Sequence, residues 1–208
     1  MIGLYTEKDS WYNKTDARFL KCGLGDNVMN DAQCREYLKR IGYTGEIAHT
    51  PQCLDDLILA HLAAIPFENL DACEDHLVPS LDEHVLFEKI IRHKRGGWCF
   101  ELNKLFFELL KGCGFQVMPV AVRITWMREE PAALLHRATV VTLENRPYFC
   151  DVGYGGPGPK GVTPLTDGEY EIQGESYQIV TGQGETGNMV ILKKRYHGEY
   201  HEMMRFQN

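Results

Sequence analysis

Between residues 30 and 114, apolar side chains recur at intervals of three and four positions, the spacing of amphipathic helices. Four helices are predicted, because each periodic stretch is bounded by capping residues, glycine or proline. They cover about residues 30–42, 51–65, 80–94 and 99–112. The third is predicted to begin with a capping box, Ser80-x-x-Glu83, and to pack Val85, Leu86, Ile90 and Ile91.

After Gly114 the pattern changes to that of β-strands. Strands are predicted at residues 115–126, 137–143 and 148–152, with further strand-like stretches near 169–180 and 188–196. The turn from Glu144 to Pro147 predicts a hairpin in which Leu143 pairs with Tyr148. Helices followed by strands predict an α+β fold, an N-terminal helical bundle before an antiparallel β-sheet or barrel, rather than a doubly wound α/β fold.

This order of elements also predicts the domain organisation. The expected units are an N-terminal extension (1–29), a helical domain (30–114) and a β domain (115–208). Of 208 residues, 44 % are hydrophobic and 25 % are charged, a composition that can form a globular core. The 22 basic and 29 acidic residues give a net charge of −7, which argues against nucleic-acid binding. No apolar run or leader is evident, so no membrane partner and a cytoplasmic location are expected.

The cysteines also favour a reducing compartment. They are odd in number, spread along the chain and contain no C-x-x-C pair, which argues against a disulfide framework. Most are therefore predicted to be small buried hydrophobic side chains. The seven positions are 22, 34, 53, 73, 99, 113 and 150.

One cysteine differs from the others in its surroundings. Two glycines in Arg95-Gly96-Gly97-Trp98-Cys99 allow a tight turn, after which Cys99 begins the fourth predicted helix. Unpaired N–H groups and the helix dipole favour a thiolate at that position. The alternative is that Cys99 is one more buried thiol, and a catalytic role requires a nearby base.

His136 is the candidate base. It begins a predicted strand whose hairpin partner carries Asp151, and the predicted pairing places both on one face. A Cys–His–Asp set is the general arrangement that activates a thiol nucleophile. The pairing leaves the two residues four positions apart, roughly 13 Å, so a twist or a bulge must close the gap. His61 lies on an apolar helix face and is predicted to be a core residue. The histidines predicted to be solvated are His49, His76, His84 and His93.

Two other patterns carry less weight. The segment from Gly153 to Gly158 matches G-x-G-x-x-G, but no helix or βαβ unit surrounds it, so a flexible rim is expected instead of a dinucleotide site. His197 and His201 have the spacing of two metal ligands on a helix. No third ligand is suggested near them, so no metal site is predicted.

Taken together, these motifs resemble the arylamine N-acetyltransferases over about residues 30–206. The resemblance implies a Cys–His–Asp core like that of cysteine proteases and transfer of an acetyl group from acetyl-CoA to an arylamine, arylhydroxylamine or hydrazine. Cys99 would carry the acetyl group, His136 would move protons and Asp151 would support His136. The matching segments are Tyr37 to Tyr43, Ile65 to Leu70, Arg95 to Asn103, the strand at His136, and Asp151 to Gly155.

Further expectations follow from the same resemblance. Phe67 and Tyr154 match aromatic positions of the family's acceptor pocket, with core packing as the alternative. Arg95 and Glu68 are expected to form an ion pair behind the nucleophile. Most of the family's C-terminal third domain is expected to be absent, which with the charge of −7 predicts weak CoA binding, another acyl donor, or completion by another subunit. The basic residues left to hold CoA phosphates would include Arg123, Arg128, Arg137 and Lys160.

Two other functions stay open at this stage. One is a truncated, non-catalytic member that serves as a binding or interaction module. The other is a Cys-dependent amide synthase or thioester hydrolase. The expected partner is a small-molecule acceptor, and the oligomeric state, a homo-oligomer included, is open.

Overall fold

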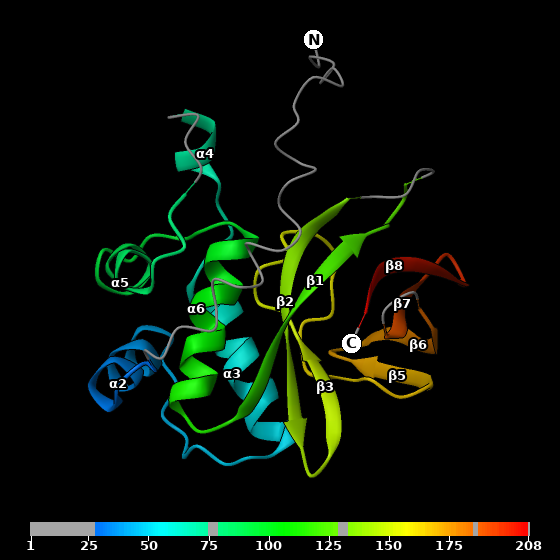
Figure 1. Cartoon of the computed structure of the whole chain (residues 1–208), viewed down its shortest axis with the longest axis horizontal. Helices are drawn as coiled ribbons and strands as arrows, with labels where there is room; N and C mark the ends of the chain where they lie inside the picture. The colour runs from blue at the N-terminus through cyan, green and yellow to red at the C-terminus, as the bar shows by residue number, and fades with distance from the viewer. Residues whose placement is uncertain (1–27, 75–78, 129–132, 185–186, 208) are drawn as a thin grey trace.

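The computed structural model describes residues 28–74, 79–128, 133–184 and 187–207, so the predicted extension lies almost entirely outside the described residues. Helices come first along the chain and strands second, which confirms the predicted α+β class (Figure 1). The helical elements are α2 (Asp31–Arg40), α3 (Pro51–Ala64), α4 (Leu70–Glu74), α5 (Glu83–Leu86), the π-helical η2 (Phe87–Arg92) and α6 (Cys99–Gly112). No helix among the described residues is long and apolar enough to cross a membrane.

Local capping explains where the first two of these helices begin. The Asn30 side chain accepts hydrogen bonds from the N–H groups of Ala32 and Gln33, both at 3.0 Å, and Gln33 accepts one from Asn30 N–H in return. Thr50 caps α3 by accepting from Cys53 N–H at 3.2 Å. These side chains satisfy N–H groups that have no partner within the helix.

The third predicted helix differs from the prediction in two ways. Its N-cap is Asp82, whose side chain accepts hydrogen bonds from the N–H groups of His84 and Val85. The Ser80 hydroxyl accepts a hydrogen bond from Asp82 N–H instead. An aspartate two residues further on offers a carboxylate cap, so the pattern matched the wrong residue. Val85 is exposed, and after Leu86 the helix widens into the π-turn η2.

The strands form one antiparallel sheet of eight in the order β4-β3-β2-β1-β8-β7-β6-β5. The predicted set of strands was incomplete. The stretch near 169–180 is a hairpin of two strands, because Gln173 and Gly174 adopt the positive φ angles of a tight turn. A last strand, β8, was missed; it pairs with both β1 and β7 and joins the two halves of the sheet. The strands are β1 (Gln116–Ile124), β2 (Leu134–Leu143), β3 (Arg146–Cys150), β4 (Thr163–Pro164), β5 (Gly168–Ile172), β6 (Glu175–Gln183), β7 (Asn188–Tyr196) and β8 (Glu199–Gln207).

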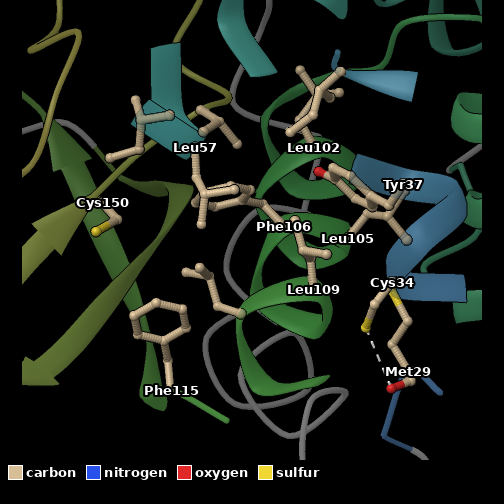
Figure 2. Close-up of a cluster of buried hydrophobic side chains, with 14 of the residues drawn as sticks. Met29, Cys34, Tyr37, Leu57, Leu102, Leu105, Phe106, Leu109, Phe115 and Cys150 are labelled. Atoms are coloured by element: carbon tan, nitrogen blue, oxygen red, sulfur yellow. Dashed lines mark hydrogen bonds between the residues drawn. The ribbon is translucent and has the colours of Figure 1, made fainter. Parts of the chain in front are cut away.

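Helix α6 is the central element of the larger core. Leu102, Leu105 and Leu109 on this helix are fully buried and pack with Tyr37 of α2 and Leu57 of α3 (Figure 2). Helix α6 also contacts β1 and β2. This packing holds the first residue of α6 next to the start of β2, and the candidate site lies there.

Candidate active site

The turn before α6 is built on two glycines that lie against the segment Pro66–Glu68. Gly97 N–H donates to Pro66 O at 3.3 Å, and Gly97 O accepts from Glu68 N–H at 2.9 Å. A Cβ on Gly96 would lie 2.1 Å from Pro66 O, so no larger residue fits there. The tight turn ends at Trp98, and α6 begins at Cys99 as predicted.

Cys99 is partly exposed, and its Sγ lies 3.8 Å from Leu135 O. As the first residue of a 14-residue helix, it sits among N–H groups that have no partner within the helix. Trp98 N–H, directly before it, donates to the Glu101 carboxylate at 3.0 Å. In general, the helix dipole favours negative charge near a helix N-terminus.

His136 and Asp151 form a buried pair beside Cys99. His136 Nε2 lies 2.6 Å from Asp151 Oδ2. Burial alone lowers the pKa of His136, but the Asp151 carboxylate and, to a smaller extent, the Cys99 thiol raise it to about 10. Burial raises the pKa of Asp151, but the contact with His136 outweighs it and holds the pKa below its usual range. The pair is therefore an imidazolium facing a carboxylate at neutral pH.

The hairpin register explains how the two residues meet. Leu143 pairs with Arg146 across a two-residue turn, and not with Tyr148 as predicted. Glu144 and Asn145 both have positive φ, the conformation that a tight hairpin turn needs. The change moves every pair by two residues and halves the expected separation of His136 and Asp151 along the ribbon.

A bulge next to His136 further distorts the strand. On β1, Val122 pairs with His136 and the next residue, Arg123, pairs with Leu134. Leu135 is thus an extra residue in β2, and it is the residue whose carbonyl faces the Cys99 thiol. Bulges redirect neighbouring side chains, and this one lies at the end of β2 that faces Cys99.

Asn103 is a site residue to which sequence reasoning gave no role. Fully buried one turn after Cys99, it donates to Asp151 Oδ1 at 2.8 Å and to Arg137 O at 2.5 Å. Its own Oδ1 accepts from Val152 N–H at 3.0 Å. The available signal was its spacing of four from Cys99, which places both side chains on the same face of α6.

The Gly-rich segment after Asp151 is a loop whose backbone N–H groups bond to the Asp151 carboxylate. Asp151 Oδ1 accepts from the N–H groups of Gly153 at 2.9 Å and Tyr154 at 3.1 Å. A Cβ on Gly153 would lie 2.9 Å from Cys99 Cα, so the loop closely approaches the start of α6. No helix follows this loop, as predicted for the false dinucleotide motif.

The two aromatic residues named from the sequence lie at this loop. The Tyr154 ring is half-buried and meets the His136 ring edge-on, with centroids 5.6 Å apart. Phe67 is 47 % exposed, and a Cβ on Gly155 would come within 2.9 Å of its ring. Both rings therefore lie on the side of the site that the Gly-rich loop covers. The expected ion pair is confirmed, with Arg95 Nη2 2.8 Å from Glu68 Oε1.

Other titratable residues lie away from the site. His61 is buried and bonded to Tyr37 at 2.7 Å, as predicted for a core histidine. Arg137 is 1 % exposed against Phe107, so the prediction that it could hold a phosphate was wrong. The described cysteines, which exclude Cys22, are free. His49, His84 and His93 are exposed as predicted, while His76 lies outside the described residues.

The described part of the chain holds no cluster of three metal-binding side chains. His197 lies in the turn between β7 and β8, and His201 lies on β8, so the two do not share a helix.

Comparison with known proteins identifies the family to which the chain is similar. A family model described as N-acetyltransferase matches residues 51–208. The arylamine N-acetyltransferase / N-hydroxyarylamine O-acetyltransferase of Salmonella typhimurium is 38 % identical over 165 residues, which are 76 % of this chain and 55 % of that protein. The proansamycin X synthase of Amycolatopsis mediterranei is 35 % identical over 168 residues, 76 % of this chain and 62 % of that protein. The chain thus spans about half the length of the curated relatives it matches.

Solved structures agree with these matches. The arylamine N-acetyltransferase of Salmonella typhimurium superposes with a TM-score of 0.78 at 30 % identity, over 86 % of this chain and 64 % of that one. The Mycobacterium marinum enzyme in complex with CoA gives a TM-score of 0.74 at 31 % identity, over 84 % of this chain and 65 % of that one. Because the sequence and the fold agree, the chain belongs to the arylamine N-acetyltransferase family.

Proposed function

We propose that this protein transfers an acetyl group from acetyl-CoA to an arylamine, arylhydroxylamine or hydrazine through an acetyl-cysteine at Cys99. The observation that carries the proposal is the position of Cys99 at the N-terminus of α6, against a charged His136–Asp151 pair. A thiol next to an imidazolium and a helix N-terminus has the two features that stabilise a thiolate.

In the first half-reaction, the Cys99 thiolate attacks the carbonyl carbon of the thioester. The new S–C bond forms, the bond to the CoA sulfur breaks, and His136 gives its proton to the departing thiolate. The Cys99 N–H is free of an intrahelical partner and is placed to stabilise the negative carbonyl oxygen of the intermediate.

In the second half-reaction, the acceptor nitrogen attacks the acetyl-cysteine. A C–N bond forms, the bond to Cys99 Sγ breaks, and the neutral His136 takes the proton that the nitrogen loses. This step restores the thiolate and the imidazolium, so both partners are ready for the next cycle. Asp151 holds the ring of His136 and stabilises its charge.

The acceptor and donor classes rest on separate observations. Phe67 is exposed and Tyr154 is half-buried beside the reacting groups, which suits a flat apolar acceptor. An arylamine is uncharged near neutral pH and keeps its lone pair for attack. Acetyl-CoA as the donor is supported by the relative from Mycobacterium marinum that binds CoA.

Intact-protein mass spectrometry tests the proposal. After incubation with acetyl-CoA, the protein should gain the mass of one acetyl group, and adding an arylamine should remove it. Cys99→Ala should abolish the adduct, whereas Cys73→Ala should keep it, because Cys73 is exposed on α4 and outside the site. No adduct with either acetyl-CoA or p-nitrophenyl acetate contradicts the proposal and favours a binding module.

A second function in the same chemical class has an observation of its own. One relative of similar identity is named as a synthase and not as an acetyltransferase. Transfer of a different acyl group by the same three residues is therefore the second candidate. It predicts an adduct with p-nitrophenyl acetate but none with acetyl-CoA, and fast adduct loss without an amine would indicate a hydrolase.

A further inference from the structure

Lys89 lies in the π-helical turn η2, which leads into the tight turn before Cys99. Within η2, His93 N–H bonds to Glu88 O at 2.8 Å across five residues, the pattern of a π-helix. Such turns are rare and often occur at functional sites. The Lys89 carbonyl accepts from Arg95 N–H at 3.1 Å, so the backbone of Lys89 directly supports the residue before the two glycines.

The ammonium group of Lys89 contacts carboxylates that come from separate segments of the chain. It lies 2.8 Å and 3.0 Å from the two oxygens of Glu101, 2.8 Å from Asp71 and 4.0 Å from Glu68. The side chain is only 13 % exposed, and that of Glu101 is 3 % exposed. Burial opposes the charge on Lys89, but the bonds to Asp71 and Glu101 outweigh it and raise its pKa. The contact with Glu101 is therefore a charge-assisted bond largely shielded from water.

Glu101 connects this cluster to the nucleophile. Its Oε2 accepts from Trp98 N–H, and its position two residues after Cys99 puts a negative charge in the first turn of α6. An uncompensated carboxylate there would disfavour a thiolate on Cys99. Among the described residues, Lys89 is the cation that pairs with Glu101.

The other carboxylates of the cluster have a second cation. Arg95 Nη2 lies 2.8 Å from Glu68 Oε1 and 2.7 Å from Asp71 Oδ1. Loss of Lys89 would therefore leave both of them paired with Arg95. Glu101, in contrast, would keep a buried charge with Trp98 N–H as its hydrogen-bond donor. The loss of Lys89 therefore acts mainly on Glu101, two residues after Cys99.

We propose that Lys89 is a positioning residue for the nucleophile, which holds and neutralises Glu101 so that the start of α6 presents Cys99 as a thiolate. The proposal rests on the role of Cys99 as nucleophile in the proposed function. Lys89 acts through Glu101 and does not touch the reacting atoms. The charged groups beside Cys99 from the β-sheet side of the fold are His136 and Asp151, which pair with each other and not with Lys89.

The pH dependence of Cys99 alkylation by iodoacetamide measures this effect without any substrate. Because Cys73 is also exposed, the adduct is followed on the separated peptides. Lys89→Met should move the midpoint of the Cys99 alkylation profile up by about one pH unit, which slows alkylation about tenfold at pH values well below the midpoint. Lys89→Arg, which keeps the charge, should recover most of the rate.

Two further variants separate the proposed role from a general structural one. The double variant Lys89→Met with Glu101→Gln removes both charges and should return the profile close to that of the wild type. Arg92→Met removes a cation from the same turn that pairs with Glu36 and Glu88 instead, and should leave the profile unchanged. Circular dichroism establishes that each variant is folded.

The results can overturn the proposal in clear ways. An unchanged profile in folded Lys89→Met rules out the positioning role. A double variant that is folded but as slow as the single one shows that the effect does not pass through Glu101, which also refutes it. If Lys89→Met fails to fold, the double variant decides: a wild-type profile supports the proposal and a shifted one refutes it. Since alkylation needs no acyl donor, these outcomes are independent of whether acetyl-CoA acetylates Cys99.

Discussion

Replacing Asn103 with leucine removes the side chain that links α6 to the histidine–aspartate pair. The wild-type amide makes three buried hydrogen bonds, to Asp151 Oδ1 at 2.8 Å, to Arg137 O at 2.5 Å and from Val152 N–H at 3.0 Å. Leucine has the same number and branching of side-chain heavy atoms as asparagine, so the change tests the hydrogen bonds more than the packing.

The expected cost follows from the kinds of bond lost. The two bonds to backbone groups contribute about 1 kcal/mol each, and the bond to the charged carboxylate about 1.5–3 kcal/mol. Asn103→Leu should therefore lower the free energy of unfolding by about 3.5–5 kcal/mol. It should also raise the pKa of Asp151, because the amide is one of the groups that hold this pKa low.

Equilibrium unfolding in urea at pH 7 measures the loss, and the pH profile of Cys99 alkylation reports on the pair. Cys99→Ala is the matched control for the unfolding measurement, because it changes a partly exposed side chain one turn before Asn103 and keeps all three bonds. A loss below about 1 kcal/mol in Asn103→Leu, with an unchanged alkylation profile, would refute the assigned role of Asn103.

Three further changes have expected outcomes. Gly153→Ala should destabilise the fold by about 1–3 kcal/mol and strongly reduce acetylation of Cys99, because the new Cβ would lie 2.9 Å from backbone atoms of Cys99. Gly182→Ala is the control, because a Cβ there has no atom within 4 Å, and it should be tolerated in the same urea unfolding and mass-spectrometry assays. The pKa of His136 is raised to about 10, so its contribution to stability is complete below about pH 6.5 and is lost as the pH rises toward 10, by at most about 1.4 kcal/mol per pH unit. His136→Gln should remove this alkaline loss of stability from unfolding measurements. A loss that persists in the variant would contradict the assignment to His136. Burial lowers the pKa of His61 to about 3, so stability should fall as the pH drops below about 6.5, and His61→Gln should flatten this acid slope.

Local features of the chain allowed several elements to be predicted correctly. Caps such as Asn30 and Thr50, and the two glycines before Cys99, act over a few residues and need no distant partner. The alternation of apolar and polar residues likewise placed β1, β2 and β3 to within three residues. These interactions are short-range, so the sequence around each element carries the information.

Elements whose contacts lie far along the chain were harder to predict. Strand β8 mixes charged and apolar residues and is recognisable mainly by its pairing with β1 and β7. The hairpin register depended on whether Glu144 and Asn145 alone form the turn, since Pro147 could belong either to the turn or to the strand. A proline at that place suits an edge or a turn equally in the sequence.

By itself, the sequence determined the α+β order of elements, the start of α6 at Cys99 and the motifs that identify the family. Only the tertiary structure decided that His136 Nε2 lies 2.6 Å from Asp151, that Asn103 joins this pair to α6, and that Lys89 pairs with Glu101. The physical reason is distance along the chain. Capping and periodicity act between neighbours. The site instead depends on side chains from a helix, a strand, the loop after β3 and a π-turn, which meet only when the core has packed.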